Sequence, residues 1–516
     1  MKKILALVLT AAMLATTLVA CSTGKTEQNT VSTGDSSSVS EATKAKDTLN
    51  VAITSEPPSL TTVDHDSLIA VNFNLLTYNS LYKIDHATLQ PVPDLASEYS
   101  VDETGTIWTF KLKEGVTFHD GSAFTSSDVV ASLEYAKTIP GSSLYTQNFQ
   151  SIEAPDEYTV VITTPQPYAG LLFDLGYHYN FIMPEELIGN NDFNANPVGT
   201  GPYILKDWVY GNTMTFEANE NYFDTENKAQ IKNLIFSIIP EGATRTIALE
   251  SDQVDFVWDV SGADISSLKA NENVEILEVN TVDNVILFLN NDKKPYDNTD
   301  FRNAINYAIN REDVIVGAMN GLGVPSYSAI PSGYWGYSDE KAPEYNLEKA
   351  KEYLKAWGGD PASVTIPILC SNESRVAVAT IIQSNLVELG IGVEIVPMDT
   401  ATYFSRWQTG DYEALVGSWS PSNSLTYVQR YHSDRSAGYP GCPSDPALDE
   451  LVIEVAKIID EDERLAKITE IVGYVNELSP QVSLYQSVWI RAFDKELEGV
   501  VCSATGYTAF NEMYWA

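Results

Sequence analysis

One stretch in the C-terminal half of the chain limits the folds that the sequence can adopt. Val364 to Leu369 is short, apolar and rich in β-branched residues, which predicts a strand. Val376 to Leu389 has apolar residues at helical spacing and ends at Gly390, and Ile391 to Met398 again predicts a strand. Strands joined through a helix pair in parallel. We therefore expect an α/β fold with a parallel sheet in this part of the chain.

Length and charge set the class of protein. The chain has 516 residues, enough for two or three domains with cores of their own, and 44% hydrophobic content fits a folded chain. Acidic residues number 70 against 31 basic ones, so the formal net charge is -39. Such a surface repels nucleic acid and anionic lipid, and we expect no nucleic-acid partner.

The N-terminus predicts an exported and anchored protein. Met1 to Lys3 is a basic start, and Ile4 to Ala20 is apolar but too short and wrongly flanked for a membrane span. The run ends Leu-Val-Ala before Cys21, which resembles a bacterial lipobox, so residues 1–20 are expected to be a lipoprotein signal peptide and Cys21 the lipidated residue. An ordinary secretory leader is the alternative.

The segment after the leader is polar and small in its side chains. Residues 21–46, the lipidated cysteine included, are expected to form a flexible tether, because they contain almost no large apolar residue. Besides Cys21 the chain has three cysteines, Cys370, Cys442 and Cys502, an odd number that excludes complete pairing. One disulfide with one free thiol, or three buried thiols, stay open.

A second stretch with a clear secondary-structure pattern lies between Asp102 and Val130. Ile107 to Leu112 alternates polar and apolar residues, which predicts a strand with one buried face. Val116 to Phe118 predicts another short strand, and Ser126 or Ser127 is expected to cap a helix that starts at Asp128.

The polar pair His119 and Asp120 sits inside this stretch. An imidazole beside a carboxylate suggests a metal-binding or catalytic site. No third ligand lies at a metal-like spacing, so a polar turn between the strands is the better interpretation. We expect no metal and no cofactor.

The stretch from Asp102 to Val130, with its Trp-Thr-Phe-Lys-Leu and Phe-His-Asp-Gly runs, resembles the signature of solute-binding protein family 5. This family comprises the extracytoplasmic receptors of oligopeptide and dipeptide ABC importers. Pro197-Val-Gly-Thr-Gly-Pro-Tyr203 and the run from Pro295 to Ile315 resemble two further family motifs. A phosphate cradle at the glycines of 197–203 is excluded, because no Lys-Ser/Thr pair or helix start follows them. The resemblance covers roughly residues 48–516.

The resemblance implies a fold and a domain plan. The fold would be the α/β, type II periplasmic-binding-protein-like class, with two lobes of mixed sheets joined by a hinge and an extra small domain. Lobe I would comprise residues 47–80, 196–287 and 488–516, the extra domain residues 81–195, and lobe II residues 288–487.

The same resemblance implies how a ligand is held, and here the sequence departs from the family. Many peptide receptors of the family place an Asp three residues after a Trp, where it pairs with the ligand ammonium. After Trp419 that position is Ser422, and the preceding strand carries no basic residue. A charged clamp would then need another carboxylate, and we consider Asp66, Asp259 and Asp434.

Tyr and Trp side chains are candidates to line a cleft for a neutral ligand or a sugar, because their rings can stack on the ligand while their O–H or N–H groups form hydrogen bonds with it. Together with loop residues that the resemblance places near the ligand, the candidate ligand-binding residues are His65, Asp66, Tyr145, Trp258, Trp335, Trp407, Trp419, Ser420, Ser422, Asn423 and Tyr485.

The resemblance implies a receptor, not an enzyme. It would capture a small solute, foremost a peptide, by hinge closure and deliver it to an ABC permease and its ATPase, as a monomer held outside the cytoplasm by lipid. An oligosaccharide or other non-peptide solute is the alternative. A secreted hydrolase is remote, because G-x-S-x-G and H-E-x-x-H are absent and the chain has only five histidines. A surface spacer would show repeats, and none is found.

Overall fold

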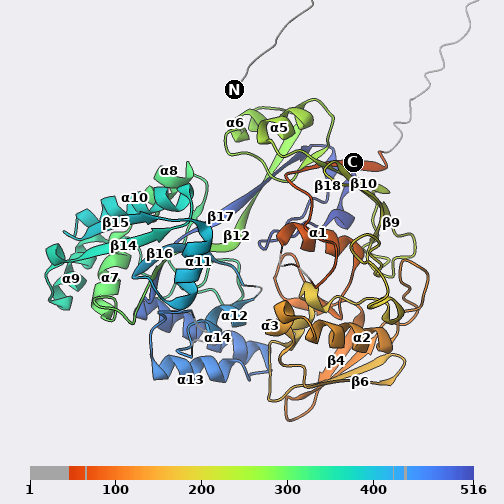
Figure 1. Ribbon diagram of the computed structural model, residues 1–516, viewed down its shortest axis with the longest axis horizontal. Helices are drawn as coiled ribbons and strands as arrows, with labels where there is room; N and C mark the ends of the chain where they lie inside the picture. Colours follow the sequence, from red (N-terminus) through yellow and green to blue (C-terminus); the bar gives the residue numbers. More distant parts are fainter. Residues whose placement is uncertain (1–45, 64, 66, 422, 435–438) are drawn as a thin grey trace, which may run out of the picture. The chain divides into compact units, whose positions relative to one another are not determined.

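The computed structural model describes residues 46–516 except 64, 66, 422 and 435–438, and its central feature is a sheet of 11 strands (Figure 1). The strand order is β15-β14-β16-β12-β17-β11-β1-β10-β9-β8, with β13 (Val324–Pro325) beside β17. We call the two ends the first half-sheet and the second half-sheet. The first comprises β1 (Thr48–Ile53), β8 (Tyr203–Val209), β9 (Thr213–Ala218), β10 (Asn233–Ile238) and β11 (Phe256–Val257). The second comprises β14 (Thr365–Cys370), β15 (Gly392–Pro397) and β16 (Ala414–Trp419).

Two long antiparallel strands connect the half-sheets. β12 (Val274–Leu289) has 16 residues and β17 (Gln481–Asp494) has 14, and they pair from Val274 opposite Asp494 to Phe288 opposite Gln481. β17 also pairs with β11, and β12 also pairs with β16. Their register shifts between Asn280 and Asn284. A bulge of this kind bends a strand locally, so it marks where the two half-sheets can change their relative angle.

Helices cover both faces of the second half-sheet. They are α7 (Thr299–Ala308), α8 (Arg311–Met319), α9 (Leu347–Trp357), α10 (Glu373–Val387), α11 (Thr400–Thr409), α12 (Ser424–Gln429), α13 (Pro446–Val455) and α14 (Glu461–Leu478). Along β12, Leu287 and Leu289 enter one core while Ile286 and Phe288 enter the other. Successive side chains of β12 point to opposite faces of the sheet, and both faces are buried, as expected for a strand inside an α/β layer structure. β14 pairs with both β15 and β16 in parallel, which confirms the predicted parallel sheet.

The first half-sheet packs on α1 (Leu68–Thr77) through a core rich in rings, including those of Phe73, Phe236, Trp258 and Phe510. Short elements complete this part: β2 (Tyr82–Ile84), β3 (Pro91–Pro93), α5 (Gly242–Glu250), α6 (Ile265–Lys269), β18 (Leu497–Glu498) and β19 (Tyr514–Trp515).

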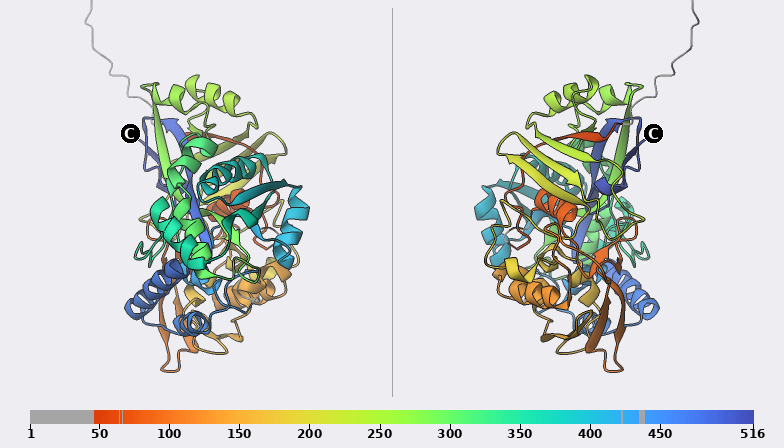
Figure 2. Two further views of the ribbon diagram at one scale, coloured as in Figure 1. Left: turned by 90° about the vertical axis from the view of Figure 1, so that its left-hand side faces the viewer. Right: turned by 90° about the vertical axis from the view of Figure 1, so that its right-hand side faces the viewer.

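A separate small sheet has four strands in the order β4-β5-β7-β6. They are β4 (Ala96–Val101), β5 (Ile107–Leu112), β6 (Ser151–Asp156) and β7 (Thr159–Thr163), and the region also holds α2 (Ser126–Lys137), α3 (Ser143–Thr146) and α4 (Leu171–Leu175). Figure 2 shows α2 (orange) and α5 (light green) at opposite ends of the described body. Residues 46–516 form one compact unit, so the lobe boundaries given above stay a prediction.

The stretch from 102 to 130 differs from expectation in two details. The predicted strand at 116–118 is only a single bridge between Thr117 and Ala123, because the backbone turns back at once. α2 begins at Ser126 and is capped by Thr125, whose N–H donates to Asp128 Oδ2 at 2.8 Å. The acidic residue predicted at the helix start is therefore the closing member of a capping box.

His119 ties this stretch to the Pro197–Tyr203 turn. Its imidazole Nε2 lies 3.0 Å from the carbonyl oxygen of Gly201, and the backbone N–H of His119 donates to the carbonyl oxygen of Gly199. Burial lowers the pKa of His119 to about 4, so the ring is neutral at physiological pH. His119 thus has a structural contact, and Asp120 caps its own turn by accepting from Ser122.

Cys370 is a buried free thiol, Cys502 is a partly exposed free thiol, and Cys442 is buried. Within the described part of the chain, no helix combines the length and the apolar character that crossing a bilayer requires.

Candidate functional site

The second half-sheet presents the carboxyl ends of two parallel strands at one edge. β14 ends at Cys370 and leads into α10, and β16 ends at Trp419 and leads into α12. β12 passes the same edge, where Asn284 pairs with Trp419. Ligands of open α/β sheets bind outside the carboxyl ends of strands. We call this the β14–β16 edge and take it, with the facing residues of the first half-sheet, as the candidate site.

Asp283 lies at this edge, one residue before the Asn284–Trp419 pair. Ser487 Oγ donates to its Oδ2 at 3.1 Å, and Ser418 and Ser420 also approach the carboxylate. Burial raises the pKa of Asp283, and hydrogen bonds from Ser487 and Ser418 and the charge of Arg375 partly offset this rise. Within the described residues this carboxylate forms no ion pair, so it is a desolvated acceptor without a directly paired cation.

Arg375 is the nearby cation, on the first turn of α10. Its Nη1 donates to Ser371 Oγ at 2.5 Å, and its guanidinium carbon lies 5.0 Å from the ring centroid of Tyr403. The helix is capped by Asn372, which accepts from the N–H of Arg375 at 3.0 Å. An arginine beside the N-terminus of a 15-residue helix gives this end of the edge a positive potential.

The charges of Asp283 and Arg375 both affect the pKa of Tyr485. Burial raises its pKa to about 12; the charge of Asp283 adds to the rise, while that of Arg375 opposes it. Its hydroxyl contacts Met319 Sδ at 3.1 Å, and its ring is 3% exposed. Tyr485 is therefore a buried residue beside the edge, packed against Met319.

The facing part of the first half-sheet has a small cavity of about 180 Å³. Trp258, Asp259, Trp489 and Arg491 line it. Asp259 is already engaged, because it accepts from Thr54 Oγ1 at 3.1 Å and lies 3.5 Å from Arg491 Nη1. This carboxylate is therefore a poorer partner for a ligand cation than Asp283.

A larger cavity of about 490 Å³ lies between the small-sheet region and the second half-sheet. Tyr145, Tyr168 and Asp174 line it from one side, and Trp419 and Asp434 from the other. Tyr168 Oη donates to Asp174 Oδ2 at 2.9 Å, and burial raises the pKa of Asp174 well above its usual value. The cavity combines aromatic surfaces with hydrogen-bonding groups, as ligand pockets do.

Trp419 belongs to both the edge and this larger cavity, and a buried arginine supports its ring. The guanidinium carbon of Arg430 lies 4.7 Å from the Trp419 ring centroid and 4.9 Å from that of Tyr439. Arg430 is 2% exposed, and its guanidinium nitrogens make no hydrogen bond to the described residues. Stacking against aromatic faces is thus its main contact, and it fixes the plane of Trp419.

The structure places the other predicted site residues as follows. Tyr145 stacks on Tyr177 with 3.7 Å between ring centroids. His65 stacks on His178 at 5.2 Å, and its Nε2 lies 3.2 Å from Asn74 Nδ2. Ser420 is exposed beside Asp283. Asp66, Ser422 and Cys21 lie outside the described residues.

Of the predicted site residues that the structure describes, six do not line these two cavities: His65, Trp335, Trp407, Ser420, Asn423 and Tyr485. Trp335 stacks with Arg464 at 5.4 Å, and Trp407 packs on Phe288 at 5.0 Å. Asn423 caps α12 by accepting from the N–H of Thr426 at 2.8 Å. The contacts of Trp335, Trp407 and Asn423 are those of core and capping residues.

Sequence reasoning missed Asp283 and Arg375. Asp283 stands two residues before the apolar run from Val285 to Leu289, and a charged residue close to a buried run was the available signal. Arg375 follows the cap of a helix that itself follows a strand, so it lies where parallel strands end.

Comparisons with known proteins give matches over most of the chain. The family model of bacterial extracellular solute-binding proteins, family 5 (middle region), matches residues 90–440. A probable D,D-dipeptide-binding periplasmic protein of Escherichia coli is 28% identical over 498 residues, covering 92% of this chain and 95% of that one. A dipeptide-binding protein of the same organism is 25% identical, covering 84% and 88%.

Solved structures share the fold. The structure of HbpA2 from Haemophilus parasuis superimposes with a TM-score of 0.82 at 24% identity, covering 91% of this chain and all of that one. AgaA of Agrobacterium tumefaciens, solved in complex with agropinic acid, gives a TM-score of 0.72 at 27% identity, covering 91% and 99%.

Proposed function

Because the chain belongs to the bacterial extracellular solute-binding proteins of family 5, we propose that it is the receptor of an ABC importer and that its ligand is a short peptide. The observation that carries the peptide assignment is the pair of opposite charges at the β14–β16 edge. Asp283 and Arg375 interact electrostatically, yet no ion pair joins them within the described residues.

A peptide with free ends would supply the missing partners. The peptide ammonium would pair with Asp283, a desolvated carboxylate without an ion-pair partner in the described residues. The peptide carboxylate would pair with Arg375 at the α10 N-terminus. An opposite charge lowers the cost of keeping Asp283 ionised in a desolvated place. A side chain of the peptide would lie against Trp419 and Tyr145 in the larger cavity.

The two Escherichia coli relatives, a probable D,D-dipeptide-binding protein and a dipeptide-binding protein, support a dipeptide-like ligand. A non-peptide solute is the second candidate, an oligosaccharide or another polar metabolite. It is favoured by the aromatic and amide side chains that line the larger cavity, and by the agropinic acid bound in one structural relative.

Capture would occur by closure of two lobes about β12 and β17. We retain residues 47–80, 196–287 and 488–516 as lobe I, 81–195 as the extra domain and 288–487 as lobe II. The bulge between Asn280 and Asn284 supports this hinge. The ligand would leave unaltered, since the receptor binds and does no chemistry.

Location and partners follow from the family and the leader. The receptor would act outside the cytoplasm as a monomer, tethered through lipid on Cys21, and would hand its ligand to an ABC permease driven by an ATPase. A diacyl or triacyl anchor gains about 0.8 kcal/mol per buried CH₂, enough for stable attachment.

Thermal-shift screening tests the ligand class. The purified protein is heated with panels of di- and tripeptides, amino acids, sugars and amines. A ligand at 100 times its dissociation constant should stabilise the protein by about 2.7 kcal/mol. We expect peptides to raise the melting temperature. A rise with sugars and none with peptides would replace the peptide by the second candidate.

A further inference from the structure

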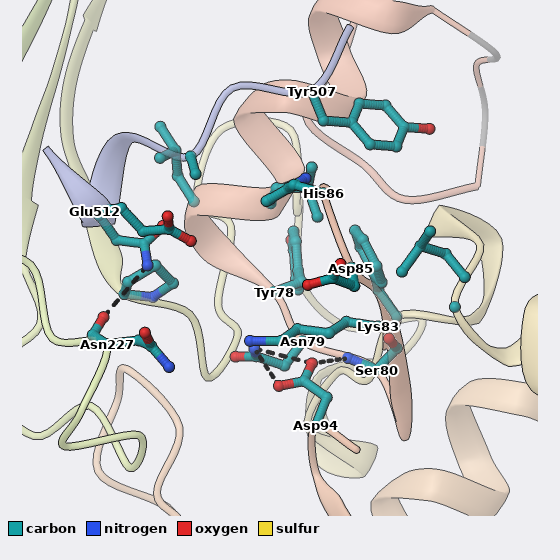
Figure 3. A pocket seen from close by; sticks show the side chains of 18 of the residues that line it. Tyr78, Asn79, Ser80, Lys83, Asp85, His86, Asp94, Asn227, Tyr507 and Glu512 are labelled. Atoms are coloured by element: carbon teal, nitrogen blue, oxygen red, sulfur yellow. Dashed lines mark hydrogen bonds between the residues drawn. The ribbon is translucent and has the colours of Figure 1, made fainter. Parts of the chain in front are cut away.

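A third cavity, of about 280 Å³, lies apart from the candidate site, which we call the cleft. It shares no lining residue with the cavities of about 180 Å³ and 490 Å³ described there. Its walls come from the end of α1, from β2 and the turn after it, and from residues 507–512 near the C-terminus (Figure 3). These segments lie far apart in the sequence. The volume is enough for a small organic molecule.

Part of the lining of this cavity is apolar and aromatic, and the rest is polar. Leu75, Leu76, Phe181 and Tyr222 contribute to its lining. Tyr78 lines it as well and is only 1% exposed, and its hydroxyl has no hydrogen-bond partner within the described residues. A buried hydroxyl without a partner costs free energy unless a guest or a water completes its hydrogen bonding.

Carboxylates outnumber cations around the cavity. At its floor, Asp94 is 3% exposed and accepts from Asn79 Nδ2 at 3.0 Å and from the N–H of Ser80 at 3.1 Å. Figure 3 shows these three residues together. Burial raises the pKa of Asp94, and the charge of Lys83 partly offsets the rise.

Asp85 and Glu512 add two further carboxylates at the cavity. Burial raises the pKa of Glu512; the charge of Lys83 partly offsets this rise, and the negative charge of Asp85 adds to it. Lys83 is the lysine of the lining, and it forms no ion pair with Asp85, Asp94 or Glu512 in the described residues. His86 is held neutral, because burial lowers its pKa to about 4. The lining therefore holds three carboxyl groups and one lysine.

We propose that this cavity is a second binding site, separate from the cleft, for a small organic ammonium ion with an aromatic or aliphatic body. The carboxylates of Asp85, Asp94 and Glu512 would attract the ammonium, and the ring faces of Tyr78 and Tyr222 would cover its body. The site stands whether or not the cleft binds a peptide.

Calorimetric titration of the purified protein with three matched probes tests the chemistry of the site. Phenethylamine carries the ammonium, 2-phenylethanol is its neutral counterpart and 3-phenylpropanoate its anionic one. We expect phenethylamine to bind, the alcohol to bind at least ten-fold more weakly and the acid not to bind. Equal binding of all three, or no binding of the amine, would overturn the proposal and leave a water-filled cavity.

Variants locate the bound amine. Glu512→Gln and Asp85→Asn should each weaken phenethylamine at least five-fold, and Lys83→Met should tighten it by removing a competing cation. Both acidic positions are partly exposed, so the variants are expected to fold, and their melting temperatures check this. Asp283→Asn is the control in the cleft and should leave the amine affinity unchanged. Loss of amine binding in Asp283→Asn alone would place the amine in the cleft and overturn the proposal.

Discussion

At the scale of the residue, the candidate site is defined by charges that the fold itself does not pair. Asp283 is desolvated and hydrogen-bonded to Ser487, and Arg375 is held by Ser371 and Tyr403. The sequence predicted an aromatic site, and Trp419 and Tyr145 do line the larger cavity. It did not predict Asp283, because its neighbours Ser418 and Ser487 come from other strands, and only the sheet register brings them together.

The first prediction concerns Asp283. Asp283→Asn keeps the shape of the side chain but removes its charge, so the affinity for a peptide with a free amino terminus should fall about 10- to 100-fold. Isothermal titration calorimetry with a peptide from the thermal-shift panel measures this. Asp259→Asn is the matched control, because Asp259 is already bound to Thr54 and Arg491, and it should change the affinity less than three-fold. Equal losses in the two variants would contradict the role of Asp283.

The second prediction concerns pH and His119. Burial depresses the pKa of His119 to about 4, so below pH 6.5 the unfolded chain binds a proton that the folded chain does not. Stability from this residue is therefore complete above pH 6.5 and is lost as the pH falls toward 4, by about 3 kcal/mol in all.

His119→Gln retains a donor for the Gly201 carbonyl but does not titrate. The free energy of unfolding in urea at pH 7, 5.5 and 4 should therefore fall less steeply in His119→Gln than in the wild-type protein. Parallel pH profiles would show that His119 does not contribute.

At the scale of the element, local patterns with a clear period were predicted well, and contacts between elements were not. The order of β14, α10 and β15 followed from the apolar spacing of residues 364–398. The strand expected at 116–118 was wrong, since a short apolar run does not reveal that the chain turns back at once. For the glycines of 197–203, the sequence excluded a phosphate cradle. The structure adds that they let this turn approach the last turn of α1.

The third prediction tests that approach. A Cβ on Gly201 would lie 2.5 Å from the carbonyl oxygen of Leu76, and the N–H of Gly201 already donates to Thr77 at 2.8 Å. Backbone cannot move aside as a side chain can, so Gly201→Ala should destabilise the protein by about 2 kcal/mol. Denaturant unfolding measures the loss. Gly473→Ala, where nothing lies within 4 Å, is the control and should be neutral or slightly stabilising. Equal stability of both variants would contradict the close approach.

At the scale of the whole molecule, one sheet runs through the described body, and only β12 and β17 join its two halves. This arrangement explains how a binding edge on one half can face a cavity on the other while both remain folded. The lobe boundaries were predicted from family resemblance and not from residue patterns. Their test is the closure itself, because binding and closure are linked.

Native mass spectrometry of the purified protein with pooled di- and tripeptides tests the central claim most directly. The same pools are added with free ends, with acetylated amino termini and with amidated carboxyl termini, and a pool of oligosaccharides serves as comparison. We predict that peptides with free ends form complexes of one peptide per protein, released with unaltered mass, and that blocked pools bind at least ten-fold less. Equal binding of the blocked pools, binding of oligosaccharides alone, or release of a chemically altered ligand would contradict the account.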